Sequence, residues 1–370
     1  MVSYPTRIVV WSRSGGRCNF PGCNEYLLDD FIAGKEDKNY GLIAHIVAET
    51  PGGPRGDPIR SPELADDPSN LMMMCYKHHK TIDDEEDCYP EQLLLDMKAT
   101  HEERVKIATG ITEDRATYVL RYAANIGSHS SPVSFPKVRV ATFPNRYPAG
   151  GQSIAIEVKG SVQTDAADLF WKLEPQNLRQ QFATLVKSRI DTGEINHLSV
   201  FALAPIPLLV ELGRLLGDIT PADVYQLHRE PAGWPWAETG SRIGYKTTTP
   251  ANKSGPVALK LGLSATITDD RITSVLGKDA SIWSIQADAP GNDIMRYPED
   301  LAQFRGLLRQ TYQAIKAAHG TTAVINIFPA IAVSAAVEIG RVWMPKADLP
   351  LTIFDEVRGH GFVPRLGIGH

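Results

Sequence analysis

The sequence predicts two structural parts: an α+β module near the N-terminus and an α/β region that fills most of the remaining chain. Two short apolar runs, separated by a Gly/Pro/Asp-rich loop and followed by a polar helical segment, indicate the first part. Strands that alternate with helices after residue 146 indicate the second part. A short signature that occurs twice in this region indicates that its two halves are related by duplication.

The composition is that of a globular protein. The chain has 370 residues, of which 43% are hydrophobic and 22% are charged, so it can form two domains. Its apolar runs fall short of the ~20 residues that span a membrane. The N-terminal residues lack a signal-peptide core. We therefore expect a soluble, cytoplasmic protein that does not contact membranes.

The net charge of −5 is unevenly distributed. Residues 1–110 contain 12 Lys/Arg and 19 Asp/Glu, a balance of −7, whereas the rest contains 26 and 24, a balance of +2. Proteins that bind nucleic acid are usually basic on the contact face. An acidic N-terminal part therefore disfavours strong DNA binding by one isolated subunit.

Residues 41–83 carry the strongest candidate for a catalytic site. The first apolar run ends at His45, Asn70 precedes the second run, and His79 begins the polar segment. The order strand, loop, strand, helix, with these three residues at the element ends, is that of a ββα-metal nuclease site. We expect His45 to act as general base on a water molecule, and Asn70 to hydrogen-bond the backbone that fixes the His45 loop.

In such a site, His79 would bind a catalytic Mg²⁺ or Mn²⁺, which neutralises the scissile phosphate. Asp83 comes four residues after His79, so both side chains lie on one side of a helix. Asp83 is therefore a candidate second metal ligand. A solvated acid within the acidic run at residues 83–87 is an equally good interpretation.

Three of the four cysteines have the spacing of a zinc site. Cys18 and Cys23 flank a Pro-Gly turn, and Cys75 is followed three residues later by His78. Thiolate and imidazole ligands in such pairs form tetrahedral structural zinc sites, whereas disulfides are rare in the cytoplasm. We expect Zn²⁺ at these four residues; the alternative is a set of unrelated buried thiols. Cys88 has no partner in the sequence.

The chain between the two parts contains further helical patterns and a linker. Apolar residues recur at three- and four-residue steps in residues 90–109, and a second helix is expected at residues 113–126. A small-residue run then begins at residue 127. We place the domains at residues 1–110, 111–145 (a helical connector and linker) and 146–370.

The duplicated signature is Val-Glu-(Leu/Ile)-Gly-Arg, at residues 210–214 and 337–341. Each copy lies in a predicted helix that follows an apolar strand and a proline. The pattern predicts two Rossmann-like halves with mainly parallel sheets. The expected strands are residues 153–159, 198–204, 223–228, 281–287, 323–328 and 351–355, and the expected helices are residues 208–216, 299–319 and 330–342.

Ligands of such sheets bind beyond the carboxyl ends of the strands, near helix N-termini. Aromatic and basic residues in these loops would suit a ligand with two bases and two phosphates. A single aromatic residue is more often part of a core than of a ligand site. The prediction therefore depends on the loop positions of these residues taken together. There is no Gly-x-Gly-x-x-Gly or Walker motif, which disfavours an ordinary dinucleotide cofactor or an NTPase. The candidate ligand-binding residues are Trp171, Pro205, Tyr225, Arg229, Trp234, Lys246 and Phe328, with Trp236 in the same loop as Trp234.

The N-terminal third resembles the HNH endonuclease family through His45, Asn70 and the segment from Cys75 to His79. The C-terminal region resembles the CARF-like SAVED domain through the duplicated Glu-(Leu/Ile)-Gly-Arg units. The combination resembles the HNH–SAVED effector nucleases of bacterial CBASS anti-phage systems. Many HNH sites have Asp directly before the first His, where this chain has Ala44. Metal binding would then depend on His79 and another group, for which we favour Asp83.

The resemblance implies an enzyme that is switched on by a second messenger. A cyclic di- or oligonucleotide, with a cyclic GMP-AMP-like dinucleotide favoured, would bind the SAVED domain and assemble a homo-oligomer. The HNH domain would then degrade double-stranded DNA with little sequence preference. One alternative is an HNH restriction endonuclease whose C-terminal domain recognises modified DNA. Another is a non-catalytic nucleotide sensor with a zinc-bearing module.

Overall fold

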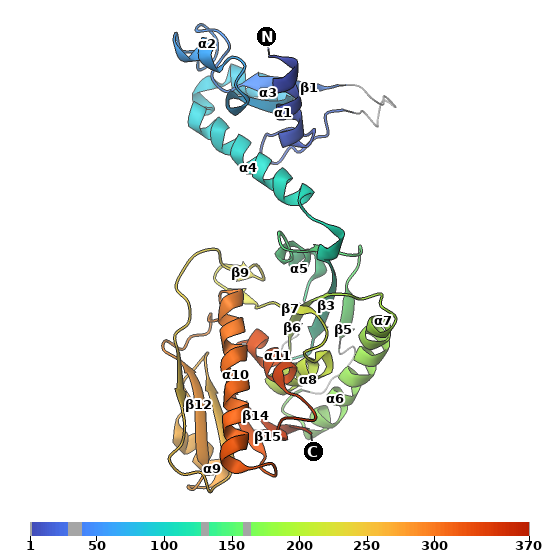
Figure 1. Ribbon diagram of the computed structural model, residues 1–370, viewed down its shortest axis with the longest axis vertical. Coiled ribbons are helices and arrows are strands. Elements are labelled where there is room, and N and C mark those ends of the chain that lie inside the picture. The colour runs from blue at the N-terminus through green and yellow to red at the C-terminus, as the bar shows by residue number, and fades with distance from the viewer. Residues whose placement is uncertain (1, 29–38, 127–132, 158–163, 370) are drawn as a thin grey trace. The chain divides into compact units, whose positions relative to one another are not determined.

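The computed structural model describes residues 2–28, 39–126, 133–157 and 164–369. The chain divides into two compact units, Met1–Thr112 and Glu113–His370 (Figure 1). Within the described residues, no helix combines the length and apolar character needed to cross a membrane.

The first unit is built around a pair of antiparallel strands, β1 (Gly41–His45) and β2 (Leu71–Cys75), in which His45 lies opposite Leu71. Helix α3 (Tyr76–Asp84) follows β2 without a break. The order strand, loop, strand, helix expected for residues 41–83 is therefore confirmed. The remaining elements are α1 (Tyr4–Ser14), α2 (Arg60–Leu64), the 3-10 turns η1 (Pro68–Asn70) and η2 (Glu86–Cys88), and α4 (Glu91–Thr109), which was expected at residues 90–109.

The core of this unit forms because every residue of β2 is buried. Met72, Met73 and Met74 are fully buried and pack with Val10 of α1 and Leu94 of α4. Methionine fills irregular spaces between elements, which suits a strand that is covered on both faces. This packing fixes β2 and the start of α3, and hence the positions of Cys75, His78 and His79.

The second unit begins with a parallel sheet whose central strand is β3. The expected helix at residues 113–126 is wrong, since residues 116–123 form β3 and pair with the neighbouring strands. The strands are β3 (Ala116–Ala123), β4 (Tyr147–Pro148), β5 (Ile154–Glu157), β6 (Leu198–Leu203) and β7 (Ala222–Val224). The helices are α5 (Phe135–Ala141), α6 (Asp168–Phe182), which continues through the π-helical η4 (Ala183–Lys187) into α7 (Ser188–Asp191), and α8 (Ile206–Leu216).

A second sheet follows, with strand order β10-β12-β11-β13-β14-β15. Its four inner strands are parallel, as expected, and its two edge strands are antiparallel. The strands are β10 (Tyr245–Thr248), β11 (Val257–Gly262), β12 (Ser281–Ala287), β13 (Ile325–Ala330), β14 (Leu351–Val357) and β15 (Gly361–Ile368). The helices are α9 (Asp269–Leu276), α10 (Pro298–His319) and α11 (Val333–Val342), and two short strands, β8 (His228–Arg229) and β9 (Ala232–Gly233), precede this sheet.

The two sheets confirm the duplication. The neighbours β5, β3, β6 and β7 in the first half correspond to β12, β11, β13 and β14 in the second. The long helices α6 and α10 occupy equivalent places in the chain, as do α8 and α11, which carry the repeated signature. Helices α8 and α11 lie side by side in the middle of the unit (Figure 1).

The glycine of the signature allows the backbones of α8 and α11 to touch. A Cβ atom on Gly213 would lie 1.9 Å from the carbonyl oxygen of Val337, and one on Gly340 would lie 1.9 Å from that of Val210. Only glycine permits an approach of this kind. The repeated Gly therefore joins the two halves.

Candidate functional site

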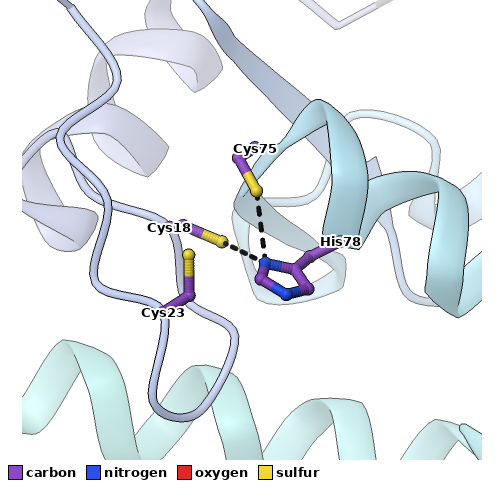
Figure 2. Close-up of side chains that lie close together, drawn as sticks. All are labelled: Cys18, Cys23, Cys75 and His78. Atoms are coloured by element: carbon purple, nitrogen blue, oxygen red, sulfur yellow. Dashed lines mark hydrogen bonds between the residues drawn. The ribbon is translucent and has the colours of Figure 1, made fainter.

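Four potential metal ligands of the first unit converge on one point (Figure 2). One ligand atom from each of Cys18, Cys23, Cys75 and His78 lies within 4.8 Å of the other three. The His78 Nδ1 atom is 3.2 Å from the Cys75 sulfur and 3.7 Å from the Cys18 sulfur. Tetrahedral zinc with ordinary bond lengths places S and N about 3.6 Å apart. The four residues expected to hold zinc therefore have a geometry that fits it.

The surroundings of the cluster hold its residues in place. Phe20 stacks on the His78 imidazole with ring centroids 4.1 Å apart. Burial raises the pKa of the Cys18 thiol to about 12 and also raises the pKa of Cys75, while burial lowers the pKa of His78. Buried cysteines lose their protons readily only when a cation stabilises the thiolates. A metal ion would do so here, with the neutral imidazole of His78 as a further ligand. Cys88 is exposed and lies outside the cluster.

The ββα arrangement places His45 at the last position of β1. Its Nε2 atom is 3.0 Å from the carbonyl oxygen of Ala65. A carbonyl can only accept, so Nε2 carries the proton and Nδ1 keeps its lone pair. His45 is therefore held as the tautomer whose Nδ1 atom can accept a proton from water.

Asn70 fixes the backbone just beyond His45. Its Oδ1 accepts a hydrogen bond from the Val47 amide at 2.8 Å, and its Nδ2 donates to the Val47 carbonyl, also at 2.8 Å. The same Nδ2 donates to Leu64 at 3.2 Å, and Asn70 is buried. These hydrogen bonds hold the backbone two residues beyond His45.

His79 lies on α3 and is held by Asp83, one turn later. The Oδ2 of Asp83 is 3.3 Å from the His79 Nδ1, and its Oδ1 accepts from the Nη2 of Arg55 at 3.1 Å. The side chain of Arg55 is itself buried: its Nε donates to the Ile46 carbonyl at 2.7 Å and its Nη1 donates to the Ile82 carbonyl at 2.8 Å. Both Asp83 oxygens thus have partners, and the Nε2 of His79 points away from them.

Ala44 adds no metal ligand. Its side chain is buried in the core of the first unit, on the other face of β1 from His45. The residue directly before His45 therefore contributes packing.

Most of the predicted ligand-binding residues of the second unit do not come together, although Tyr225 and Trp234 both pack on Phe201. Phe328 is fully buried and stacks on Phe354, Trp234 is buried against Phe201, and Trp171 is buried and donates to the Asp165 carbonyl. These three side chains pack against neighbouring residues of the second unit. Of the others, Pro205 is the buried N-cap of α8, Arg229 is exposed on β8, and Lys246 is exposed and pairs with Asp288.

A cavity of about 460 Å³ lies between the two halves of the second unit. It adjoins the carboxyl end of β7 and the N-terminus of α10, the location expected for a ligand of parallel sheets. Tyr225 and Trp236 line it, as residues of the predicted ligand loops. Four further charged or aromatic residues line the cavity and were not among the predicted ligand-binding residues: Arg242, Tyr297, Arg305 and Glu338.

The cavity combines aromatic faces with charged groups. The guanidinium of Arg242 lies over the Tyr297 ring, 3.9 Å from its centroid, and pairs with Glu299 at 3.2 Å. Burial raises the pKa of Glu338, although Arg341 and Arg305 beside it oppose this shift. Tyr297 follows β12, so the rule for strand ends did indicate its loop; Arg305 and Glu338 lie inside helices, where that rule gives no signal.

A duplicated α/β domain with a cavity between its halves is an architecture suited to binding a small ligand. The family model described as "SAVED: SMODS-associated and fused to various effectors sensor domain" matches residues 178–368, more than half of the chain. The chain therefore belongs to the SAVED family. The match begins within α6, so β3 and β5, which complete the first half, precede it.

Solved structures of SAVED proteins are similar to this chain. The Acinetobacter baumannii Cap4 SAVED/CARF-domain containing receptor with the cyclic trinucleotide 3'3'3'-cAAA is 10% identical, with a TM-score of 0.43, over 79% of this chain and 61% of that one. The Moraxella osloensis Cap4 SAVED/CARF-domain containing receptor is 9% identical, with a TM-score of 0.41, over 79% and 60%. The chain spans about three fifths of these proteins. No curated protein matches it.

Proposed function

We propose that this protein is a ligand-gated DNA endonuclease of anti-phage defence, in which the SAVED domain binds a cyclic oligonucleotide and the first unit cuts double-stranded DNA. The observation that carries the nuclease proposal is the placement of His45 at the end of β1, of Asn70 directly before β2, and of His79 on α3. The cavity between the two halves supports the sensor proposal, because it offers aromatic faces for bases and arginines for phosphates.

The proposed reaction is hydrolysis of a phosphodiester bond. His45 takes a proton from water at Nδ1, and the resulting hydroxide attacks phosphorus. A bound Mg²⁺ or Mn²⁺ would neutralise the phosphate and stabilise the leaving oxygen. His79 would bind that ion through Nε2. Asn70 keeps His45 in place by holding the backbone at Val47.

We assign Asp83 to the orientation of His79, in place of direct metal binding. An imidazole that donates its second N–H to a carboxylate is held in the tautomer and orientation that favour metal binding. Asp83 supplies that carboxylate, and Arg55 holds its other oxygen. The zinc cluster would keep β2, α3 and the loop at Cys18 together.

The charge of the first unit supports a requirement for assembly. Residues 1–110 have a balance of −7, so one copy would bind DNA weakly. Several copies brought together by a ligand would hold DNA through combined contacts.

The test is cleavage of plasmid DNA by the full-length protein with Mg²⁺ or Mn²⁺, with and without a panel of cyclic di- and trinucleotides. We expect cleavage only with one class of cyclic nucleotide, and none for His45→Ala with assembly intact. His360→Ala, at an exposed position, is the control and should cut normally. Cleavage that never depends on a cyclic nucleotide would refute gating, and cleavage confined to modified DNA would favour a restriction enzyme. Unchanged cutting by His45→Ala would refute the assigned base.

A further inference from the structure

The duplication provides an internal comparison for a buried glutamate at the cavity. In the first half, Glu211 of α8 is fully buried and both of its oxygens are hydrogen-bonded. Its Oε1 accepts from Arg179 of α6 at 2.6 Å and from the Nη2 of Arg214 at 2.5 Å, and its Oε2 accepts from the Nε of Arg214 at 2.8 Å. This carboxylate is fully paired.

Glu338 of α11 is the equivalent residue of the second half, with Arg341 and Arg305 in place of Arg214 and Arg179. Its Oε1 accepts from Arg341 at 3.0 Å, while Arg305 of α10 stays 3.7 Å away, too far for a hydrogen bond. Its Oε2 is buried and has no hydrogen-bond partner among the described residues. Glu338 and Arg305 also line the cavity.

A buried carboxyl oxygen without a partner is costly, so native structures rarely leave one unexplained. The arrangement of one glutamate with two arginines does not by itself leave an oxygen unpaired, because both oxygens of Glu211 are hydrogen-bonded in the equivalent arrangement. What differs at Glu338 is the neighbouring cavity and the looser contact with Arg305. The missing partner is therefore best supplied by a molecule in the cavity.

The chemistry of the cavity limits the kinds of molecule that could supply this hydrogen-bond donor. A carboxyl oxygen accepts from N–H groups, and it pairs with the exocyclic amino group of a base. The aromatic rings of Tyr225, Trp236 and Tyr297 can stack a base, and Arg242 and Arg305 can hold phosphates.

We propose that Glu338 reads the base of the ligand: its free oxygen accepts a hydrogen bond from the exocyclic amino group of a purine, and so selects adenine or guanine over hypoxanthine. This inference rests on the proposed binding of a cyclic oligonucleotide. Glu211, by contrast, has a purely structural role.

The test is equilibrium binding of cyclic GMP–AMP, cyclic di-AMP and cyclic tri-AMP, and of their analogues with hypoxanthine as base, to the full-length protein. Wild type should bind at least one amino-bearing probe about 10- to 100-fold more tightly than its hypoxanthine analogue. Glu338→Gln should lose most of this preference, and its thermal unfolding shows whether it is folded. Glu211→Gln is the matched control and should keep the preference.

Two results would overturn the inference, and they are distinguishable. If wild type binds a cyclic nucleotide but Glu338→Gln keeps the full preference, or Glu211→Gln loses it equally, then Glu338 does not read the base while the sensor function stands. If wild type binds none of the probes, the proposed sensor function fails and this inference fails with it.

Discussion

Replacing Gly213 by alanine tests how the two halves of the SAVED domain are joined. The new Cβ would lie 1.9 Å from the Val337 carbonyl oxygen, whereas ordinary contact begins at 3.4 Å, so α8 and α11 must separate by about 1.5 Å. Overpacking of a core costs about 1–3 kcal/mol, and backbone atoms yield less than side chains do. Alanine gains about 1 kcal/mol in helix propensity. We expect a net loss of about 2 kcal/mol.

The assay is thermal unfolding of the full-length protein followed by tryptophan fluorescence, since five of its six tryptophans lie in the second unit. A loss of about 2 kcal/mol should lower the midpoint by about 4–8 °C. Gly306→Ala in α10 is the matched control, because its Cβ would meet no described atom within 4 Å and alanine should stabilise the helix. Equal stabilisation by both substitutions would refute the backbone contact.

Three further predictions concern the metal sites and pH. Cys18→Ser should remove bound zinc, measured by elemental analysis, and destabilise the first unit, whereas Cys88→Ser should keep the zinc; equal zinc content in both variants would contradict the cluster. Arg55→Met should weaken Mn²⁺ binding, followed by electron paramagnetic resonance, about 10-fold because Asp83 loses its support, and unchanged binding would remove Arg55 from the site. Burial lowers the pKa of His197 from 6.5 to about 4, so between these pH values the unfolded chain is protonated at His197 and the folded chain is not. The free energy of unfolding should therefore fall by on the order of 3 kcal/mol as the pH drops from 6.5 to 4. Urea unfolding across this pH range checks it, and His197→Asn should flatten the dependence.

The sequence predicted those features that depend on local pattern. The run from Gly41 to Asp83 has apolar strands bounded by polar residues, so its element order and the positions of His45, Asn70 and His79 followed directly. The cysteine spacing indicated a cluster that the structure forms. The repeated Glu-(Leu/Ile)-Gly-Arg signature indicated the duplication, since the same helix packing needs the same residues in both halves.

Features that depend on contacts between residues far apart in the sequence could not be predicted from local patterns. A helix is expected from the sequence at residues 113–126, although the β-branched and aromatic residues of β3 favour the strand that forms there. Its parallel pairing with β5 and β6 agrees with that composition. The lining of the cavity could not be predicted from local patterns, because Arg242, Arg305 and Glu338 are far apart in the sequence and meet only when the two halves pack together.

The amide of Asn70 extends the two-stranded sheet by one further pair of hydrogen bonds. With Val47 it makes the reciprocal donor and acceptor contacts that a strand residue would make through its peptide group. Asp at this position lacks the donor, and Gln places the amide one methylene too far. Loss of cleavage in such variants would therefore report a displaced loop, and Asn70 would score as essential in a mutational scan without touching a reacting atom.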